Sequence, residues 1–417
     1  MKRRGALARR SAAEWGVRAA VAVIATGLGI GSVTSSLAYL IRGSSPESAH
    51  ILAPNDGRIT ALLSVKVLSP DGKPGDKRQS DALAALALKQ DPTAVSALTT
   101  LGVNAELRGD KAAARRIFAY AQILSRRDLP TRLWAIEDAV GREDIPGALR
   151  NYDIALRTSR RAPEILFPIL VTSIADPNIR NSLARTLATR PAWGEQFIAY
   201  VSSNGPDAQA TAELFILLER RGVKQSPGPA AALIKRLLAE GQPEVAWRYY
   251  KGITPNADRR KSRDPDFLQN RITPSPFDWN PISDGGISST IQRGDHGGIF
   301  DFAVPSNFGG PMLQQVQLLP AGSYVLEGRS AGIDQNTDAL PYWVLSCSDG
   351  RELGRVTVSP SKQNDGRFAG RFDVPSACLI QQLTLVSRPS DNVSGVTGQI
   401  DSIELRPLQS RTQLSGR

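Results

Sequence analysis

The sequence predicts a multi-domain protein with an N-terminal transmembrane helix, an α-solenoid in the middle and a C-terminal antiparallel, jelly-roll-like β-sandwich. Three observations lead to this prediction. The chain carries no charge between Arg18 and Arg42, its middle repeats with a period of 34 residues, and its hydrophobic pattern changes to a period of two after about residue 274. A chain of 417 residues accommodates several domains.

Residues 19–41 are predicted to form the transmembrane helix, since the uncharged run is long enough to cross about 30 Å of hydrocarbon. Six basic residues precede this run and two follow soon after it. The positive-inside rule therefore places residues 1–18 in the cytoplasm as a basic tail, and the bulk of a single-pass inner-membrane protein in the periplasm. A cleaved signal peptide, with a small-residue site at 36–38, and a buried soluble helix are the alternatives.

Gly27 and Gly31 lie four residues apart within this apolar run, on one face of the predicted helix. Small residues at this spacing let two membrane helices approach closely. We therefore expect the two glycines to form a helix-packing face in the membrane. A homodimer is one arrangement that such a face would allow.

Residues 80–251 are predicted to form the α-solenoid. A set of small and aromatic residues recurs at a shift of 34 positions: Ala114, Phe118 and Ala121, then Ala148, Tyr152 and Ala155. Six further amphipathic segments follow up to about residue 250, and breaks that contain proline separate them. Because each helical hairpin buries its open face only by stacking on the next, we expect an array of about nine or ten helices.

This region resembles the tetratricopeptide repeat family over about residues 80–160. The family has small residues where helices cross, an aromatic residue on the second helix and a proline that ends each unit. The chain departs from the pattern because Ile136 replaces a glycine, Glu143 replaces the turn glycine and the first unit lacks a clear leading helix. The resemblance implies a solenoid that binds an envelope protein partner, and a simple spacer is the alternative.

Residues 274–408 are predicted to form the β-sandwich. Nine short segments with alternating hydrophobicity are separated by turns rich in glycine, aspartate and proline. The polar residues 252–273 and residues 42–79 are expected to be linkers, and residues 409–417 a tail.

The sandwich resembles carbohydrate-binding modules in its segments 276–280, 319–324 and 398–405. The order of anchor, repeat helices and such a sandwich resembles envelope proteins of Gram-negative bacteria, some of which are linked with exopolysaccharide production. This resemblance implies binding of glycan or of protein. Trp279, with Asp278 and Asn280 beside it, is the candidate glycan contact, because sugars pack on exposed aromatic rings next to polar groups. A core position is the alternative for Trp279.

Cys347 and Cys378 are the only two cysteines and lie on separate predicted strands. In an exported domain, such a pair predicts a disulfide, which would stabilise the fold by roughly 3 to 4 kcal/mol.

Charge and residue types exclude several functions. Much of the net charge of +11 precedes the membrane segment, so we expect no nucleic-acid partner. With two histidines and no distinctive pair of carboxylates, the sequence predicts no catalytic residue, no cofactor and no metal site. We expect a non-catalytic scaffold in surface polysaccharide production or export. A periplasmic polysaccharide-modifying enzyme and a purely structural protein-assembly factor are the alternatives.

Overall fold

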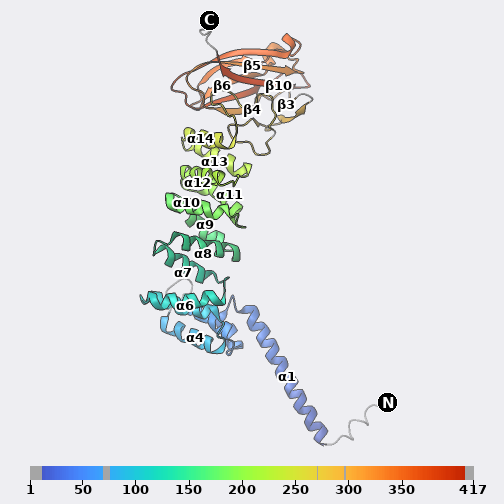
Figure 1. Ribbon diagram of the computed structural model, residues 1–417. Coiled ribbons are helices and arrows are strands. Elements are labelled where there is room, and N and C mark those ends of the chain that lie inside the picture. Colours follow the sequence, from blue (N-terminus) through green and yellow to red (C-terminus); the bar gives the residue numbers. More distant parts are fainter. Residues whose placement is uncertain (1–11, 69–75, 270, 295–296, 409–417) are drawn as a thin grey trace, which may run out of the picture. The chain divides into compact units, whose positions relative to one another are not determined.

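The computed structural model describes residues 12–68, 76–269, 271–294 and 297–408 (Figure 1). The chain separates into two compact units, Met1–Leu166 and Phe167–Arg417. Helices fill the first unit, and helices followed by two antiparallel sheets fill the second, as the sequence predicts. Residues 1–11 of the predicted basic tail and the predicted tail 409–417 lie outside the described residues.

Fourteen α-helices lie within these described ranges. Their bounds are α1 Ala12–Ile41, α2 Pro46–Leu52, α3 Gly57–Leu68, α4 Lys77–Gln90, α5 Val95–Leu107, α6 Lys111–Leu124, α7 Leu129–Val140, α8 Ile145–Thr158, α9 Ala162–Ser173, α10 Pro177–Ala188, α11 Gly194–Asn204, α12 Ala208–Arg220, α13 Pro227–Ala239 and α14 Pro243–Ile253. α4 to α14 make eleven helices where about nine or ten were expected.

α1 is long and apolar enough to span a membrane. It begins at Ala12, earlier than the predicted anchor, because Glu14, Trp15 and Arg18 continue the helical turns. Most of its side chains are exposed, whereas Ala38 near its end is buried in a cluster with residues of α2 and α3. The apolar helix is therefore joined directly to a folded segment.

α3 to α8 form three helical hairpins with the predicted 34-residue period. The second helices of the hairpins, α4, α6 and α8, begin 34 residues apart. An aspartate caps the N-terminus of each of these helices. The side chains of Asp76, Asp110 and Asp144 accept hydrogen bonds from backbone N–H groups of the first turn. A side chain at Gly102 would lie 2.6 Å from the Phe118 ring, so this small residue permits the crossing of α5 and α6.

The structure corrects the predicted linker 42–79, because α2 and α3 lie within it. α3 is the leading helix that the first repeat was expected to lack, and its Ala61 is buried against Ala84 and Ala87 of α4. Leu88 and Leu101 pack against these alanines, and Ile59 of α3 is buried with Ala38 and Ala49. α3 is therefore an apolar helix of the folded repeat region and not part of a linker.

The C-terminal β-sandwich consists of two five-stranded antiparallel sheets. The strands are β1 Asn280–Pro281, β2 Ser288–Gly294, β3 Gly297–Val304, β4 Gly310–Gln317, β5 Gly322–Ala331, β6 Tyr342–Cys347, β7 Glu352–Thr357, β8 Arg367–Val374, β9 Gln381–Ser387 and β10 Val396–Pro407. Sheet A has the order β1-β4-β9-β6-β7, and sheet B has the order β2-β3-β10-β5-β8. Nine of these strands overlap the nine predicted segments; the two-residue strand β1 was not predicted.

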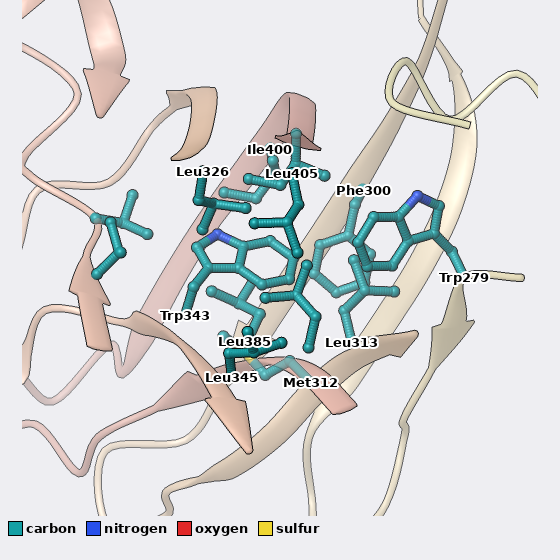
Figure 2. Packing of buried hydrophobic residues seen from close by; sticks show 14 of the residues in the cluster. Trp279, Phe300, Met312, Leu313, Leu326, Trp343, Leu345, Leu385, Ile400 and Leu405 are labelled. Atoms are coloured by element: carbon teal, nitrogen blue, oxygen red, sulfur yellow. The ribbon is translucent and has the colours of Figure 1, made fainter. Parts of the chain in front are cut away.

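Large apolar side chains from both sheets fill the space between them (Figure 2). Trp343 of β6 is fully buried, and alternate residues of β3, β9 and β10 point to the same core. Such alternation is the pattern of strands with one buried face. Most side chains on the opposite faces of the sheets are half-buried or exposed.

The structure also corrects the predicted linker 252–273. Its charged residues suggested an exposed tether, yet Arg263 and Phe267 within it are buried. Phe267 belongs to the core of the sandwich, and the backbone of Arg263 exchanges two hydrogen bonds with the Gln315 side chain of β4. This segment is therefore an integral part of the β-domain.

Candidate functional site

Trp279 lies in the core and presents no ring face to a glycan. Only 4 % of its surface is exposed, its Nε1 donates to the Asp264 carbonyl at 2.9 Å, and its ring centre lies 5.7 Å from that of Trp343 (Figure 2). The predicted glycan contact is therefore wrong. Polar neighbours and proline made this segment resemble an exposed loop, but the tryptophan, which directly precedes β1, packs into the core.

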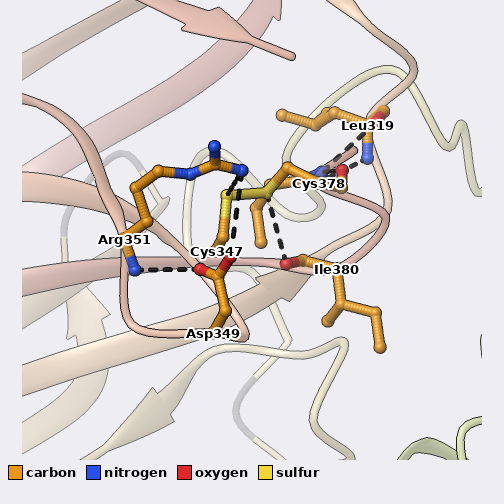
Figure 3. Close-up of a disulfide and its surroundings, with 7 residues drawn as sticks. Leu319, Cys347, Asp349, Arg351, Cys378 and Ile380 are labelled. Carbon is orange, nitrogen blue, oxygen red and sulfur yellow. Dashed lines mark hydrogen bonds and ion pairs between the residues drawn. A yellow bond between two sulfur atoms is a disulfide. The ribbon is translucent and has the colours of Figure 1, made fainter. Parts of the chain in front are cut away.

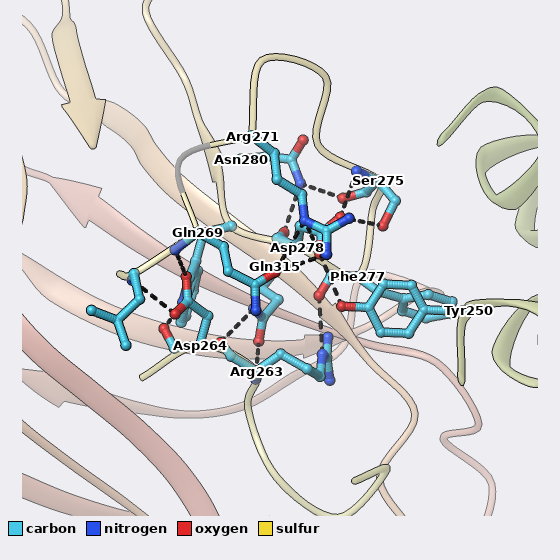
Figure 4. A network of polar contacts seen from close by, with 12 residues as sticks. Tyr250, Arg263, Asp264, Gln269, Arg271, Ser275, Phe277, Asp278, Asn280 and Gln315 are labelled. Carbon is cyan, nitrogen blue, oxygen red and sulfur yellow. Dashed lines mark hydrogen bonds and ion pairs between the residues drawn. The ribbon is translucent and has the colours of Figure 1, made fainter. Parts of the chain in front are cut away.

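Asp278 joins the last helix to the sandwich, and Asn280 bonds to the loop beside it (Figure 4). The Asp278 carboxylate accepts hydrogen bonds from the Tyr250 hydroxyl of α14 at 2.8 Å and from the Ser275 hydroxyl at 2.7 Å. Burial raises the pKa of Tyr250, and the neighbouring Asp278 charge acts in the same direction. Asn280 donates to the Ser275 and Asp278 carbonyls. The buried Asp278 is thereby assigned to structure, whereas Asn280 is half-buried and lines a cavity beside α13, so its predicted glycan contact stays a prediction.

Arg263 is the buried centre of the same junction. Its guanidinium donates to the Phe277 carbonyl at 3.0 Å, to Gln317 Oε1 at 2.6 Å and to the Val316 carbonyl. The guanidinium carbon also lies 5.8 Å from the ring centre of Trp247 in α14. Desolvation lowers the pKa of Arg263 to about 10. The guanidinium is buried and each of its three nitrogens donates a hydrogen bond, so we assign it to structure.

A disulfide joins Cys347 and Cys378, whose Cα atoms are 5.6 Å apart (Figure 3). Cys347 ends β6 and Cys378 precedes β9, so the bond closes a loop that contains β7 of sheet A and β8 of sheet B. The Cys347 N–H donates to the Arg351 carbonyl at 2.8 Å, which closes the turn beside the bond. The disulfide thus secures the crossing from one sheet to the other.

Gly27 and Gly31 lie on the exposed surface of α1. No described atom would come within 4 Å of a Cβ built at either position, apart from those of the helix itself and the chain neighbours. The surface beside the two glycines is therefore open. Helix packing through this face stays a prediction.

The outward side of sheet A is the candidate binding surface of the β-domain. We define the sheet A face by its outward side chains on four strands: Gln314, Val316, Tyr342, Val344, Ser346, Glu352, Arg355, Thr357, Gln382, Thr384 and Val386. Strand registers align these residues in rows, one of which runs Gln314, Thr384, Val344 and Arg355. Amides, hydroxyls and a guanidinium therefore lie side by side on one surface.

Two arginines lie over the ring of Tyr342. The guanidinium carbons of Arg355 and Arg388 are 4.7 and 4.8 Å from its centre, within the range of cation–π contacts. Arg355 also binds both oxygens of Glu352, at 2.6 and 2.8 Å. The hydrogen bonds from Arg355 lower the pKa of the Glu352 carboxyl. This carboxylate is therefore charged at neutral pH, and its charge is balanced by Arg355.

A cavity of about 430 Å³ adjoins the other end of the sheet A face. α13 forms one wall with Ala231, Ala232 and Lys235, and Gln314 and Gln382 belong to the opposite wall. The Gln382 side-chain amide donates to Gln314 Oε1 at 2.5 Å. The sheet A face therefore continues into a hollow that also contacts the helical region.

Hydrogen bonding is the chemistry that the sheet A face offers. Its amides and hydroxyls can each donate and accept, as the hydroxyl groups of a sugar do. Within the described ranges, no group of three His, Cys, Asp or Glu side chains is arranged to hold a metal ion. Within β9 the sequence contained a signal for this face, since Gln382 and Thr384 alternate with buried leucines, although no tryptophan marks it.

No family model and no curated protein matches the chain. Among solved structures, the chain is similar to the xylan-binding CBM22-1 domain of a Paenibacillus barcinonensis protein, with 11 % identity, 35 % of this chain and 93 % of that chain covered, and a TM-score of 0.25. It is also similar to Pseudomonas aeruginosa PilF, with 14 % identity, coverage of 55 % and 94 %, and a TM-score of 0.27. PilW, a type IV pilus biogenesis factor, has 17 % identity, coverage of 48 % and 93 %, and a TM-score of 0.25.

Proposed function

We propose that the protein is a non-catalytic, membrane-anchored scaffold of the cell envelope that binds a polysaccharide on the sheet A face and a protein partner on its solenoid. It acts in the production or export of that surface polysaccharide. The observation that carries this proposal is the sheet A face, where four strands present half-exposed or exposed amides, hydroxyls and a tyrosine on one surface.

The composition of the sheet A face favours a glycan over a folded protein. Protein interfaces are usually centred on large aromatic or aliphatic anchors. Here the one aromatic ring, Tyr342, lies under two guanidiniums, and the middle of the face consists of Thr384, Val344 and Ser346. A surface of small polar groups instead complements the many hydroxyls of a sugar chain.

The anchor and the disulfide support an extracytoplasmic location. α1 is long and apolar enough to span a membrane, and the basic residues of the chain before it favour a cytoplasmic N-terminus. Disulfides persist in oxidising compartments such as the periplasm. The bond between Cys347 and Cys378 therefore supports the placement of the sandwich outside the inner membrane.

The helical region supports the second half of the proposal. A cavity of about 550 Å³ opens between the α10–α11 and α12–α13 connections. Apolar Leu187, Ile198 and Val223 line it together with charged Arg190 and Lys224. Stacked helical repeats commonly use such surfaces to bind segments of other proteins.

Affinity electrophoresis tests the glycan part of the proposal. The full-length protein in detergent is run through gels that contain polysaccharide from the producing cell. We expect retardation, and we expect Gln382→Ala to weaken binding about tenfold because it removes hydrogen bonds at the face. Gln399→Ala is the matched control, since Gln399 pairs with Asp301 on sheet B.

Three results would count against the proposal. The wild-type protein could migrate without retardation, or Gln382→Ala could bind as tightly as the control. Release of new reducing ends from the polysaccharide would contradict the non-catalytic role. Retardation of the wild type and the control, with weakened binding by Gln382→Ala and an intact polymer, is the outcome that we expect.

A further inference from the structure

We propose that the bound polysaccharide is acidic, and that its carboxylates are received by Arg388 at one end of the sheet A face and by Lys235 of α13 at the other. This inference rests on the proposed function, because it names the class of glycan that the same surface takes. It also extends the site beyond the sandwich, since α13 belongs to the helical region.

Arg388 and Lys235 are cations without a carboxylate partner. Among the residues that the structure describes, no carboxylate oxygen lies within 4.0 Å of either side chain. The arginines next to these two cations do have carboxylate partners: Arg355 pairs with Glu352 at 2.6 Å, and Arg236 of α13 pairs with Glu240 at 2.7 Å. Glu352 is the one carboxylate in the set that defines the face, and its charge is balanced by Arg355. The positive charges of Arg388 and Lys235 therefore remain unbalanced.

The ring of Tyr342 does not offer the flat platform on which neutral sugars commonly stack. Guanidinium groups of Arg355 and Arg388 already cover it, at 4.7 and 4.8 Å from its centre. Arg388 donates to the Asp338 carbonyl at 3.5 Å and keeps further N–H groups for a ligand. A planar guanidinium matches a carboxylate with two parallel hydrogen bonds, which makes an acidic sugar the better partner.

The two cations are spaced for a polymer. Gln382 lines the cavity with Lys235, whereas Val386, four residues further along β9, pairs with Tyr342 beneath Arg388. Four residues of a strand extend about 13 Å, which exceeds the length of one sugar ring. Hydrogen-bonding groups such as Thr384 lie between the two ends. A chain with recurring carboxylates can therefore contact both cations at once.

Titration calorimetry with a matched pair of polymers tests the inference. The full-length protein in detergent is titrated with polygalacturonate and with its fully methyl-esterified form, which has the same backbone without the charges. We expect polygalacturonate to bind at least about tenfold more tightly, with an affinity that falls as salt is added. Arg388→Gln and Lys235→Gln should each weaken this binding about tenfold and leave binding of the ester unchanged.

Arg371→Gln is the control, because Arg371 is an exposed arginine of β8 in sheet B and should have no effect. Equal affinity for the two polymers would overturn the inference and leave the proposed function intact. Binding of neither polymer nor of the cell's own polysaccharide would overturn the proposed function. Equally tight binding of polyglutamate would reassign the surface to an acidic protein segment and so overturn the inference.

Discussion

At the scale of single residues, a substitution of Arg263 tests how the β-domain is joined to α14. Its guanidinium supplies the donors for Gln317 and for the Phe277 and Val316 carbonyls inside the junction. Arg263→Ala leaves these acceptors buried without partners, so we expect a loss of about 3 kcal/mol in the free energy of unfolding. Urea unfolding followed by tryptophan fluorescence measures the loss.

Arg271→Ala is the matched control for this variant. The Arg271 side chain is 32 % exposed and lies 3.6 Å from Asp278, so its removal should cost less than about 1 kcal/mol. An equal loss in both variants would contradict the structural role that we assign to Arg263.

Single residues also show where sequence reasoning succeeds and fails. Gly109 and Glu143 stand 34 positions apart, and both adopt positive φ angles, of 81° and 57°. Glu143 was regarded as a departure from the repeat, yet the backbone keeps the turn that glycine would allow. In contrast, polar neighbours made Trp279 look exposed, because the groups that enclose it, such as Trp343 and the Asp264 carbonyl, are distant in sequence.

At the scale of elements, the disulfide holds together the strands that pass between the two sheets. It spans 31 residues of sequence, which include β7 and β8. Closing a loop of this length stabilises the fold by about 3 to 4 kcal/mol through the unfolded chain. We expect the double variant Cys347→Ser, Cys378→Ser to lose this amount in urea unfolding.

Reduction provides the control for that measurement. Wild-type protein unfolded in the presence of reductant should match the double variant, and reductant should leave the double variant unchanged. A wild-type transition that does not move on reduction would contradict the stabilising role of the bond.

Most elements were predictable because they carry their own hydrophobic period. The helices α10 to α14 and nine of the strands follow their segments closely, since each buries one face and is bounded by glycine, proline or aspartate. The segment around Arg263 was not predicted to be part of the fold because it buries charge, so its composition resembles that of a linker.

At the scale of the whole molecule, the proposal joins an anchor, a partner-binding solenoid and a glycan-binding sandwich. The separate parts were predictable from the sequence, whereas the sheet A face was visible only as alternation within single strands and not as an assembled surface. Its residues come from four strands, and only their pairing brings Gln314, Thr384 and Arg355 into one row. A site assembled from such distant segments leaves no compact motif in the sequence.

The central claim is that α1 holds the folded bulk of the chain on the periplasmic side of the inner membrane. Protease treatment of intact spheroplasts tests it most directly, with an epitope placed after Arg417 and a cytoplasmic protein as the control for lysis. We predict that protease removes the epitope without lysis, and that untreated protein stays in the membrane pellet after an alkaline wash. An epitope protected until lysis, or protein released into the supernatant, would contradict the claim.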